Sequence, residues 1–239
     1  METGDYMAEV HRSGYDLAAA ADGHLDVPVP TCPDWVMADL VFHLGSVQSR
    51  WSLLGTGAVR VEELVLPDRP GDDELVDWFR SGVDATVEAL GSVDPTAERW
   101  NWSGADQTAG WIQRRMAQEA AVHAWDGGNA VGSPEPIPTA VAIDGIDEFF
   151  EVFVRARASQ FAGAEESIHV HSTDGEGEWV LTVGSGRTSF ERIHAKGDVA
   201  VRGPASDLLL TMWSRGPRPA VEVIGEGDVL DRFLATVTI

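Results

Sequence analysis

The sequence predicts an α+β protein, with a four-helix bundle in its first half and a small α/β domain in its second. Apolar residues recur at helical spacing as far as about residue 125, and beyond about residue 160 their period changes from 3.6 to 2. Between the halves, the segment GNAVGSPEPIPTA (residues 128–140) is dense in glycine and proline, which is typical of a domain boundary. We therefore expect a first domain at residues 1–133 and a second, including a linker helix, at residues 134–239.

A proline-rich segment separates the first two predicted helices. Residues 6–21 carry a loose apolar stripe at helical spacing, and the segment VPVPTCPDW that follows contains three prolines in six residues. Prolines remove backbone donors and disfavour helical geometry in the preceding residue, so the first helix has to end before them. The spacing predicts a second helix over residues 35–51, with Thr31 and Asp34 as a capping pair and Pro33 in the first turn.

Two more helices complete the predicted bundle. Apolar residues at helical spacing over residues 75–90 predict a third helix, with Asp72 or Asp73 as its cap. Thr108 is expected to cap a fourth helix, which we expect to end at the glycine pair of residues 127–128. Four helices joined by loops indicate a helix bundle.

The second domain is expected to begin with an amphipathic helix over residues 146–154 and to continue with short strands. Strict alternation of apolar residues predicts these strands, and a Gly-Ser-Gly turn follows the second of them. The predicted strands lie at residues 168–171, 179–183, 199–201 and 221–223. Two helices are expected among them, in the segments SDLLLTMW and DVLDRFLATV.

Composition and charge exclude several classes of function. Of 239 residues, 39 are acidic and 17 are basic, and the formal net charge is -22. This charge repels phosphate backbones and anionic lipid surfaces, so neither nucleic acid nor membrane is an expected partner. Cys32 is the only cysteine, which excludes an internal disulfide and a cluster of thiolate ligands. Because no apolar run has the length of a signal-peptide core or a membrane span, we expect a soluble cytoplasmic protein.

A candidate metal site lies in the predicted fourth helix. Glu119 and His123 are four residues apart, so their side chains project from one helical face and can reach one small cation. His43 lies on the apolar stripe of the predicted second helix and is expected to point inward. Two imidazoles and one carboxylate form a plausible zinc set that leaves one coordination position open. From the residues alone, the alternative stays open that the pair is a solvated helix face and His43 a core histidine.

Three side chains near this set each admit two interpretations. Arg115 lies one turn before Glu119, where it can pair with a substrate carboxylate as a catalytic residue or hold Glu119 in place. Asp126 can accept the second ring N–H of His123, or lie exposed at the end of the helix. Cys32 can be a nucleophile beside a helix start, although a buried structural cysteine is the favoured interpretation.

His169 and His171 share one face of a predicted strand, because successive side chains of a strand point to opposite sides. Such a pair can bind a metal ion, but the sequence offers no third ligand nearby. We therefore expect both histidines to be solvent-side residues.

Several stretches of the chain carry a resemblance that covers nearly its whole length. They are VPTCPDWVMADLVFHLGSVQSRW, WIQRRMAQEAAVHAWDG, IHVHSTDGEGEW and VRGPASDLLLTMWSR. In their order and approximate spacing they resemble the actinobacterial mycothiol-dependent maleylpyruvate isomerase family, whose first domain is a DinB-like four-helix bundle. One departure is Gln118, where members often have a histidine; its side chain is expected to point away from the stripe of Glu119 and His123.

The resemblance implies a metal centre and a thiol cosubstrate. It implies that His43, Glu119 and His123 hold zinc or another divalent metal, which activates the sulfhydryl of mycothiol for addition to a small electrophilic substrate. The reaction is then an isomerisation or an S-transfer. Arg215, in the MWSRGP turn, is a candidate contact for mycothiol. A monomer or a homodimer is expected.

The sequence leaves two other functions open. The first alternative is a zinc hydrolase. It needs a general base near the ion, and Glu119 cannot be both metal ligand and base. The second alternative is a non-catalytic DinB-like protein that binds a metal or another ligand.

Overall fold

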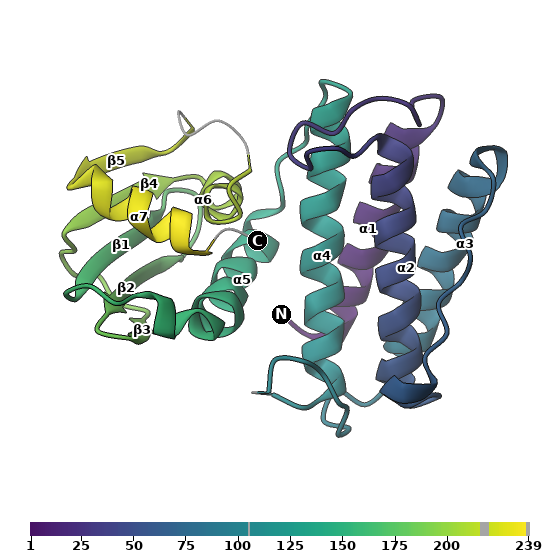
Figure 1. Ribbon diagram of the computed structural model, residues 1–239, viewed down its shortest axis with the longest axis horizontal. Helices are drawn as coiled ribbons and strands as arrows, with labels where there is room; N and C mark the ends of the chain where they lie inside the picture. Colours follow the sequence, from purple (N-terminus) through teal and green to yellow (C-terminus); the bar gives the residue numbers. More distant parts are fainter. Residues whose placement is uncertain (105, 216–219, 238–239) are drawn as a thin grey trace. The chain divides into compact units, whose positions relative to one another are not determined.

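The structure is a computed structural model that describes residues 1–104, 106–215 and 220–237. It confirms the predicted fold class, and the chain divides into two compact units, Met1–Glu135 and Pro136–Ile239 (Figure 1). The division falls close to the boundary expected after residue 133. Among the described residues, no helix combines the length and the apolar character that crossing a membrane requires.

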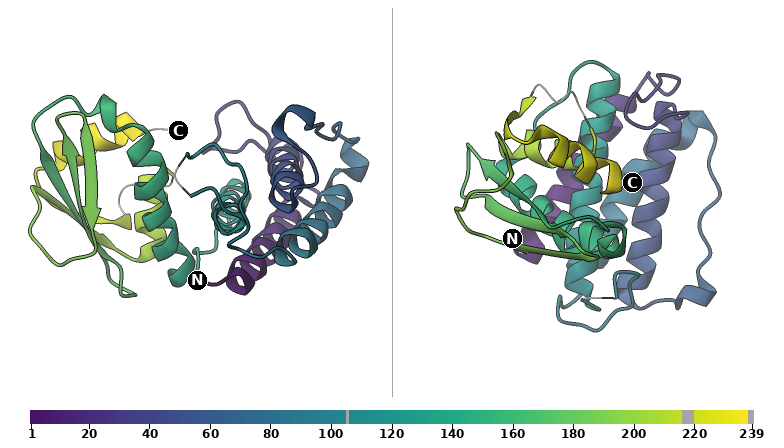
Figure 2. Two further views of the ribbon diagram at one scale, coloured as in Figure 1. Left: turned by 90° about the horizontal axis from the view of Figure 1, so that it is seen from below. Right: turned by 60° about the vertical axis from the view of Figure 1, so that its left-hand side comes forward.

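Four helices form the first unit. They are α1 (Thr3–Ala21), α2 (Met37–Thr56), α3 (Asp72–Gly91) and α4 (Ala109–Ala130), with a short 3-10 turn at Val61–Glu63 between α2 and α3. Helix α1 packs against α4 and α3, while α2 packs against α3 and α4 (Figures 1 and 2). Their apolar stripes meet in one core, whose fully buried members include Leu17, Leu40, Leu44, Leu75, Phe79 and Ala120. The pairing of α2 with α4 brings together the two helices that carry the candidate metal ligands.

Helix α2 begins at Met37, two residues later than predicted, and the predicted capping pair is wrong. Asp39 instead accepts a hydrogen bond from the amide of Val36 at 3.1 Å. The segment before the helix is held in turns, because Pro28 and Val36 form an isolated antiparallel bridge and Asp34 adopts a left-handed backbone with φ 70°. Thr31 is consequently not at the helix start, and its hydroxyl is used elsewhere.

Helix α4 begins as predicted but ends later. The Thr108 hydroxyl accepts a hydrogen bond from the amide of Trp111 at 3.3 Å, which confirms the predicted cap. The helix continues through the glycine pair to Ala130. A Cβ on Gly127 would lie 2.5 Å from Cδ1 of Leu17, so this glycine permits close packing of α1 against α4 rather than ending the helix.

The second unit combines a mixed sheet with helices. Helix α5 (Thr139–Glu148) continues as a wider π turn at Phe149–Val154, so the predicted linker helix begins earlier than expected. A 3-10 turn at Ala158–Gln160 follows. The remaining elements are β1 (Glu166–Ser172), β2 (Glu178–Gly184), β3 (Arg187–Glu191), β4 (Val199–Gly203), α6 (Ala205–Met212), β5 (Glu222–Gly225) and α7 (Gly227–Val237).

The sheet has the strand order β3-β2-β1-β4-β5, in which only β1 and β4 run parallel. Burial alternates along β1, β2 and β4, so that one face carries buried residues such as Val170, Trp179 and Val201. Helices α5, α6 and α7 lie on this face (Figure 2). Within the described ranges, no helix covers the other face (Figure 2). The alternating burial along β1 places its two histidines on this uncovered face.

Strand β3 was not predicted from the sequence. Its residues RTSFE contain one apolar side chain, that of Phe190, and therefore lack the alternation that marks a strand. Pairing with β2 through the Gly-Ser-Gly turn forms it. Gly184 has φ 141°, and a Cβ there would lie 2.4 Å from the carbonyl oxygen of Ala164, so this turn requires glycine.

Candidate metal centre

Three predicted ligands come together between α2 and α4. Nε2 of His43 lies 3.4 Å from Oε1 of Glu119, and Nε2 of His123 lies 3.4 Å from the same oxygen. All three donor atoms lie within 4.8 Å of one another. The two imidazole rings meet edge-on, with their centroids 5.1 Å apart. One small cation can therefore be reached by both nitrogens and the carboxylate oxygen at once.

Helix geometry and bundle packing each contribute part of this arrangement. Glu119 and His123 are one turn apart on α4 and share a face, as their spacing predicts. His43 enters from α2, whose side chains Leu40, Val41 and Leu44 are buried in the bundle core. The side chain of His43 remains 35% exposed whereas that of His123 is 9% exposed, so the donor set is open to solvent on the His43 side.

Asp126 orients His123 from inside the bundle. Its Oδ2 lies 2.9 Å from Nδ1 of His123, and its side chain is fully buried, which excludes the alternative of an exposed helix-end residue. Oδ1 accepts a 2.6 Å hydrogen bond from the hydroxyl of Thr31, and the sulfur of Cys32 lies 3.9 Å from Oδ2. The turn before α2 thus holds Asp126, and Asp126 directs Nε2 of His123 toward Glu119.

Arg115 lies on the other side of Glu119. Its Nη2 donates a 3.0 Å hydrogen bond to Oε2 of Glu119, and its side chain is 4% exposed. This contact leaves Oε1 directed toward the two histidines. This geometry favours the interpretation in which Arg115 holds Glu119 in place over the one in which it pairs with a substrate carboxylate.

The protonation of the cluster follows from these contacts. Burial by itself raises the pKa of Glu119, but hydrogen bonds from His123 and His43 and the charge of Arg115 hold this pKa well below its usual range. Burial lowers the pKa of His123, but hydrogen bonds and charges from Asp126 and Glu119 raise it to about 9. At neutral pH and without a metal ion, His123 is therefore an imidazolium held between two carboxylates.

These residues fit a divalent metal ion. The site already stabilises one positive charge, the proton on Nε2 of His123, at the point where the three donor atoms converge. A cation that displaces this proton meets an ionised carboxylate and two imidazoles, which is a donor set of the zinc type.

A second donor set shares His123 and competes with the first. Cys32, His123 and Asp126 also bring one donor atom each within 4.8 Å of one another. This set would use Nδ1 of His123, which already faces Asp126, and Asp126 is fully buried. A substrate reaches the set of His43, Glu119 and His123 more readily, because His43 and Glu119 are partly exposed.

Comparison with known proteins identifies the family. The family model described as the mycothiol maleylpyruvate isomerase N-terminal domain matches residues 6–126, and the MDMPI C-terminal domain matches residues 140–232. The chain belongs to the mycothiol maleylpyruvate isomerase family. The predicted resemblance is thereby confirmed, over both halves of the chain.

Solved structures support the fold of this family member. A crystal structure of the mycothiol-dependent maleylpyruvate isomerase matches with a TM-score of 0.64 and 13% identity, covering 95% of each chain. The structure of a histidine-to-alanine mutant of the mycothiol-dependent maleylpyruvate isomerase matches with the same TM-score and coverage at 12% identity. At these identities the likeness establishes the fold. No curated protein matches the chain in sequence.

The second unit of this family member holds the predicted cosubstrate contact, Arg215. Nη1 of Arg215 donates to the carbonyl oxygen of Trp213 at 3.1 Å, and the guanidinium lies 5.9 Å from the Trp213 ring centroid. These local contacts orient the side chain. A contact between Arg215 and mycothiol remains a prediction.

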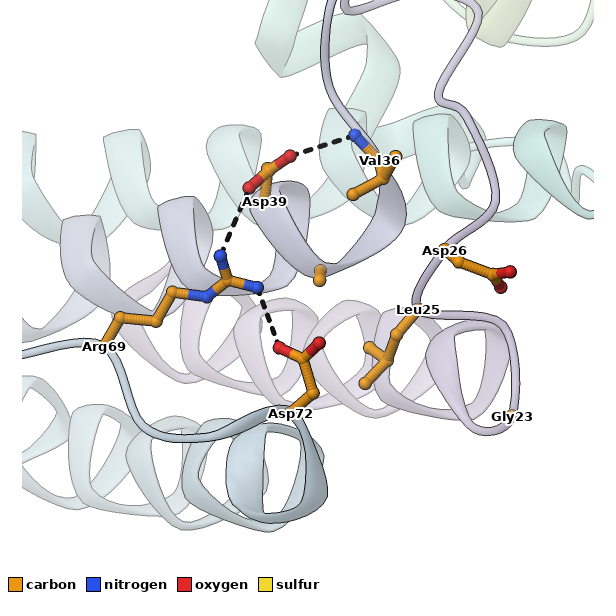
Figure 3. A pocket seen from close by; sticks show the side chains of 8 residues that line it. Gly23, Leu25, Asp26, Val36, Asp39, Arg69 and Asp72 are labelled. Carbon is orange, nitrogen blue, oxygen red and sulfur yellow. Dashed lines mark hydrogen bonds and ion pairs between the residues drawn. The ribbon is translucent and has the colours of Figure 1, made fainter.

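A hollow of about 460 Å³ lies elsewhere on the first unit, near the starts of α2 and α3 (Figure 3). The positively charged side chain that lines it is that of Arg69. Its Nη2 donates a 2.9 Å hydrogen bond to Asp72, and its Nη1 lies 3.6 Å from a carboxylate oxygen of Asp39. Asp26 also lines the hollow. Because two carboxylates already engage the guanidinium of Arg69, this side chain links the starts of α2 and α3 and is not available to bind an anion. The hollow contains none of the candidate metal ligands.

One sequence prediction about the second unit is wrong. The sequence predicts no third ligand near His169 and His171, but Glu178 and His194 lie beside them. Glu178 is placed opposite His171 by the register of β1 and β2. His194 follows β3, the strand that the sequence pattern does not predict. No local sequence pattern could therefore predict that His194 lies beside His169 and His171.

Proposed function

We propose that this chain is a zinc-dependent enzyme that uses mycothiol, as an isomerase or an S-transferase acting on a small electrophilic substrate. The observation that carries the proposal is the convergence of His43 Nε2, Glu119 Oε1 and His123 Nε2 within 4.8 Å. Three protein ligands leave a coordination position for an exogenous group, as catalytic zinc sites do and structural sites do not. The family to which the chain belongs is named for a thiol-dependent reaction, which supports mycothiol as the cosubstrate.

The charges around the site favour an anionic sulfur. Arg115 and imidazolium His123 balance the carboxylates of Glu119 and Asp126, so the cluster carries no net charge while His123 holds its extra proton. When a divalent cation replaces that proton, the net charge becomes +1, which a thiolate neutralises. A bound zinc ion would lower the pKa of the mycothiol sulfhydryl and hold it as the thiolate.

The residues of the chain then have separate tasks. Asp126 keeps the Nδ1 proton of His123, so that Nε2 remains a donor for the metal. Arg115 holds one oxygen of Glu119 and prevents the carboxylate from turning away. Trp35, whose ring centroid lies 4.9 Å from that of His43, forms an apolar wall beside the solvent-facing ligand. Arg215 is proposed to contact a polar group of mycothiol.

The hydrolase alternative lacks a general base among the described side chains at the site. Glu119 is bonded to Arg115 and faces both histidines, while Asp126 is fully buried and bonded to His123 and Thr31. Neither carboxylate is placed to accept a proton from a solvent-side water.

The decisive experiment combines ligand binding with turnover. We expect mycothiol to raise the melting temperature only when zinc is present, and to support isomerisation of maleylpyruvate or conjugation of an electrophile. His43→Ala is expected to abolish both effects, while His24→Ala, which alters an exposed histidine, leaves them unchanged. Zinc binding without any response to mycothiol would favour the hydrolase, and no metal at His43 would favour the non-catalytic alternative.

A further inference from the structure

Four side chains of the second unit direct their ligand atoms to one point on the uncovered face of the sheet. Oε1 of Glu178 lies 2.8 Å from Nε2 of His169 and 2.9 Å from Nδ1 of His171, and it also contacts Nδ1 of His194. The four donor atoms lie within 4.8 Å of one another. Three ring nitrogens thus converge on one carboxylate oxygen, and the four ligand atoms are close enough together for one ion to contact all of them.

The arrangement is built by the sheet rather than by chance proximity of surface side chains. His169 and His171 are two residues apart on β1, and Glu178 pairs with His171 across the β1–β2 ladder, so all three share one face. Two strands therefore fix three of the four ligands. His194 follows β3, the neighbour of β2, and joins the others from the edge of that face.

The three histidine rings are steeply inclined to one another. The three pairs of histidine rings make interplanar angles of 65°, 88° and 78°, with centroids 5.5 to 6.5 Å apart. Each ring directs one nitrogen to Oε1 of Glu178. Stacked imidazoles would not direct their lone pairs to the same place.

Hydrogen bonding alone satisfies this cluster poorly. A carboxylate oxygen offers about two lone-pair sites, yet three ring nitrogens crowd the same Oε1. A cation at the centre would accept lone pairs from all three nitrogens and from the oxygen, which removes the crowding.

We propose that His169, His171, Glu178 and His194 form a second metal site, which binds one divalent transition-metal ion of the zinc class independently of the site in the bundle. Three nitrogen donors and one oxygen donor suit zinc and its late first-row neighbours, while calcium and magnesium require oxygen-rich sites. Four protein ligands complete a tetrahedron, so the ion holds the segment after β3 against β1 and β2 instead of activating a substrate.

Access and charge support the same site. The side chain of His194 is 79% exposed, and those of His171 and Glu178 are 33% and 26% exposed, so an ion can enter from solvent. His169 is the most enclosed, at 12%. The net charge of -22 attracts cations to the molecule as a whole.

Zinc stoichiometry of the full-length chain tests the proposal, with zinc itself as the probe. After removal of metal by a chelator, the protein is dialysed against zinc and its zinc content is measured. We expect two ions per chain in the unaltered protein, one in a His43→Ala/His123→Ala variant and one in a His169→Ala/His171→Ala variant. Zinc-free protein in the first variant would overturn the second site, whereas zinc-free protein in the second variant would instead oppose the proposed bundle site.

Milder substitutions keep the test independent of folding. In the His43→Ala/His123→Ala background, His194→Ala and Glu178→Gln are expected to weaken zinc binding by at least about tenfold, because each removes a ligand. His194 is exposed and its replacement leaves no cavity. Glu176→Gln, an exposed glutamate between β1 and β2, is the matched control and should leave the affinity unchanged. Unchanged affinity in both ligand variants would overturn the proposal.

Discussion

Nδ1 of His123 lies 2.9 Å from Oδ2 of Asp126, three residues further along α4, and the carboxylate has no exposed surface. A buried carboxylate next to a ligand histidine fixes the tautomer and the orientation of the ring. The Thr31 hydroxyl completes the connection from the proline-rich turn to the candidate metal centre. This relationship makes Asp126 the first target for mutation.

Asp126→Asn is expected to weaken zinc binding at the bundle site by about tenfold to a hundredfold. The amide keeps the size of the carboxylate but no longer favours a proton on Nδ1 of His123, so Nε2 is a poorer donor. Zinc titration against a chromogenic chelator, in a His169→Ala/His171→Ala background, measures the effect at this site alone. The exposed Asp16→Asn substitution serves as the control. Equal affinities for the two variants would show that Asp126 does not position the ligand.

Arg115→Met is expected to destabilise the metal-free protein by about 1–3 kcal/mol, because Glu119 then loses its charge-assisted hydrogen bond. Arg115→Lys restores the charge but not the fixed fork geometry, so partial recovery of zinc affinity is expected. Denaturant unfolding and zinc titration measure the two effects. Normal zinc affinity combined with a raised KM in Arg115→Met would instead indicate that Arg115 contacts the substrate.

Cys32→Ala is expected to preserve zinc binding and thiol-dependent turnover, while His43→Ala abolishes both. The prediction follows from the choice between the two donor sets that share His123. Both variants are compared for zinc content and for turnover with mycothiol. Loss of zinc in Cys32→Ala, with zinc retained in His43→Ala, would assign the metal to the set of Cys32, His123 and Asp126.

Asp174 is expected to make the second unit sensitive to acid. It accepts hydrogen bonds from the amide of Ala205 and from the hydroxyls of Ser172 and Thr139, and thereby contacts the first residues of both α6 and α5. Burial raises the pKa of Asp174, but these hydrogen bonds outweigh it and lower the pKa below its usual range.

Because the pKa is lower in the folded state, the stabilisation by Asp174 is fully present above the unfolded-state pKa of about 3.9. It disappears as the pH falls through the lower folded-state value. Asp174→Asn should therefore lower the free energy of unfolding near neutral pH by about 0.3–1 kcal/mol, because the amide can still accept a hydrogen bond but lacks the negative charge at the helix starts, and by less in acid. Unfolding curves at several pH values measure the difference from the unaltered protein. A difference that does not shrink in acid would contradict this assignment.

The local pattern of the sequence is sufficient to predict the helices of the bundle and part of the candidate metal site. The period of apolar residues placed four helices, and the four-residue spacing placed Glu119 and His123 on one face. Thr108 was recognisable as a cap because its role depends on a residue three positions away. Elements that depend on distant partners were missed, as β3 shows, because pairing with β2 and not its own residues makes it a strand.

The sequence by itself determined the fold class, the faces of the helices and which residue types were available to bind a metal. Only the tertiary structure decided that His43 meets Glu119 across two helices, that Thr31 bonds Asp126, and that His194 joins the histidines of β1. Helical and strand periods are local properties, since they follow from backbone geometry over a few residues. Convergence of side chains from separate elements depends on helix packing and strand register, which no short stretch of sequence contains.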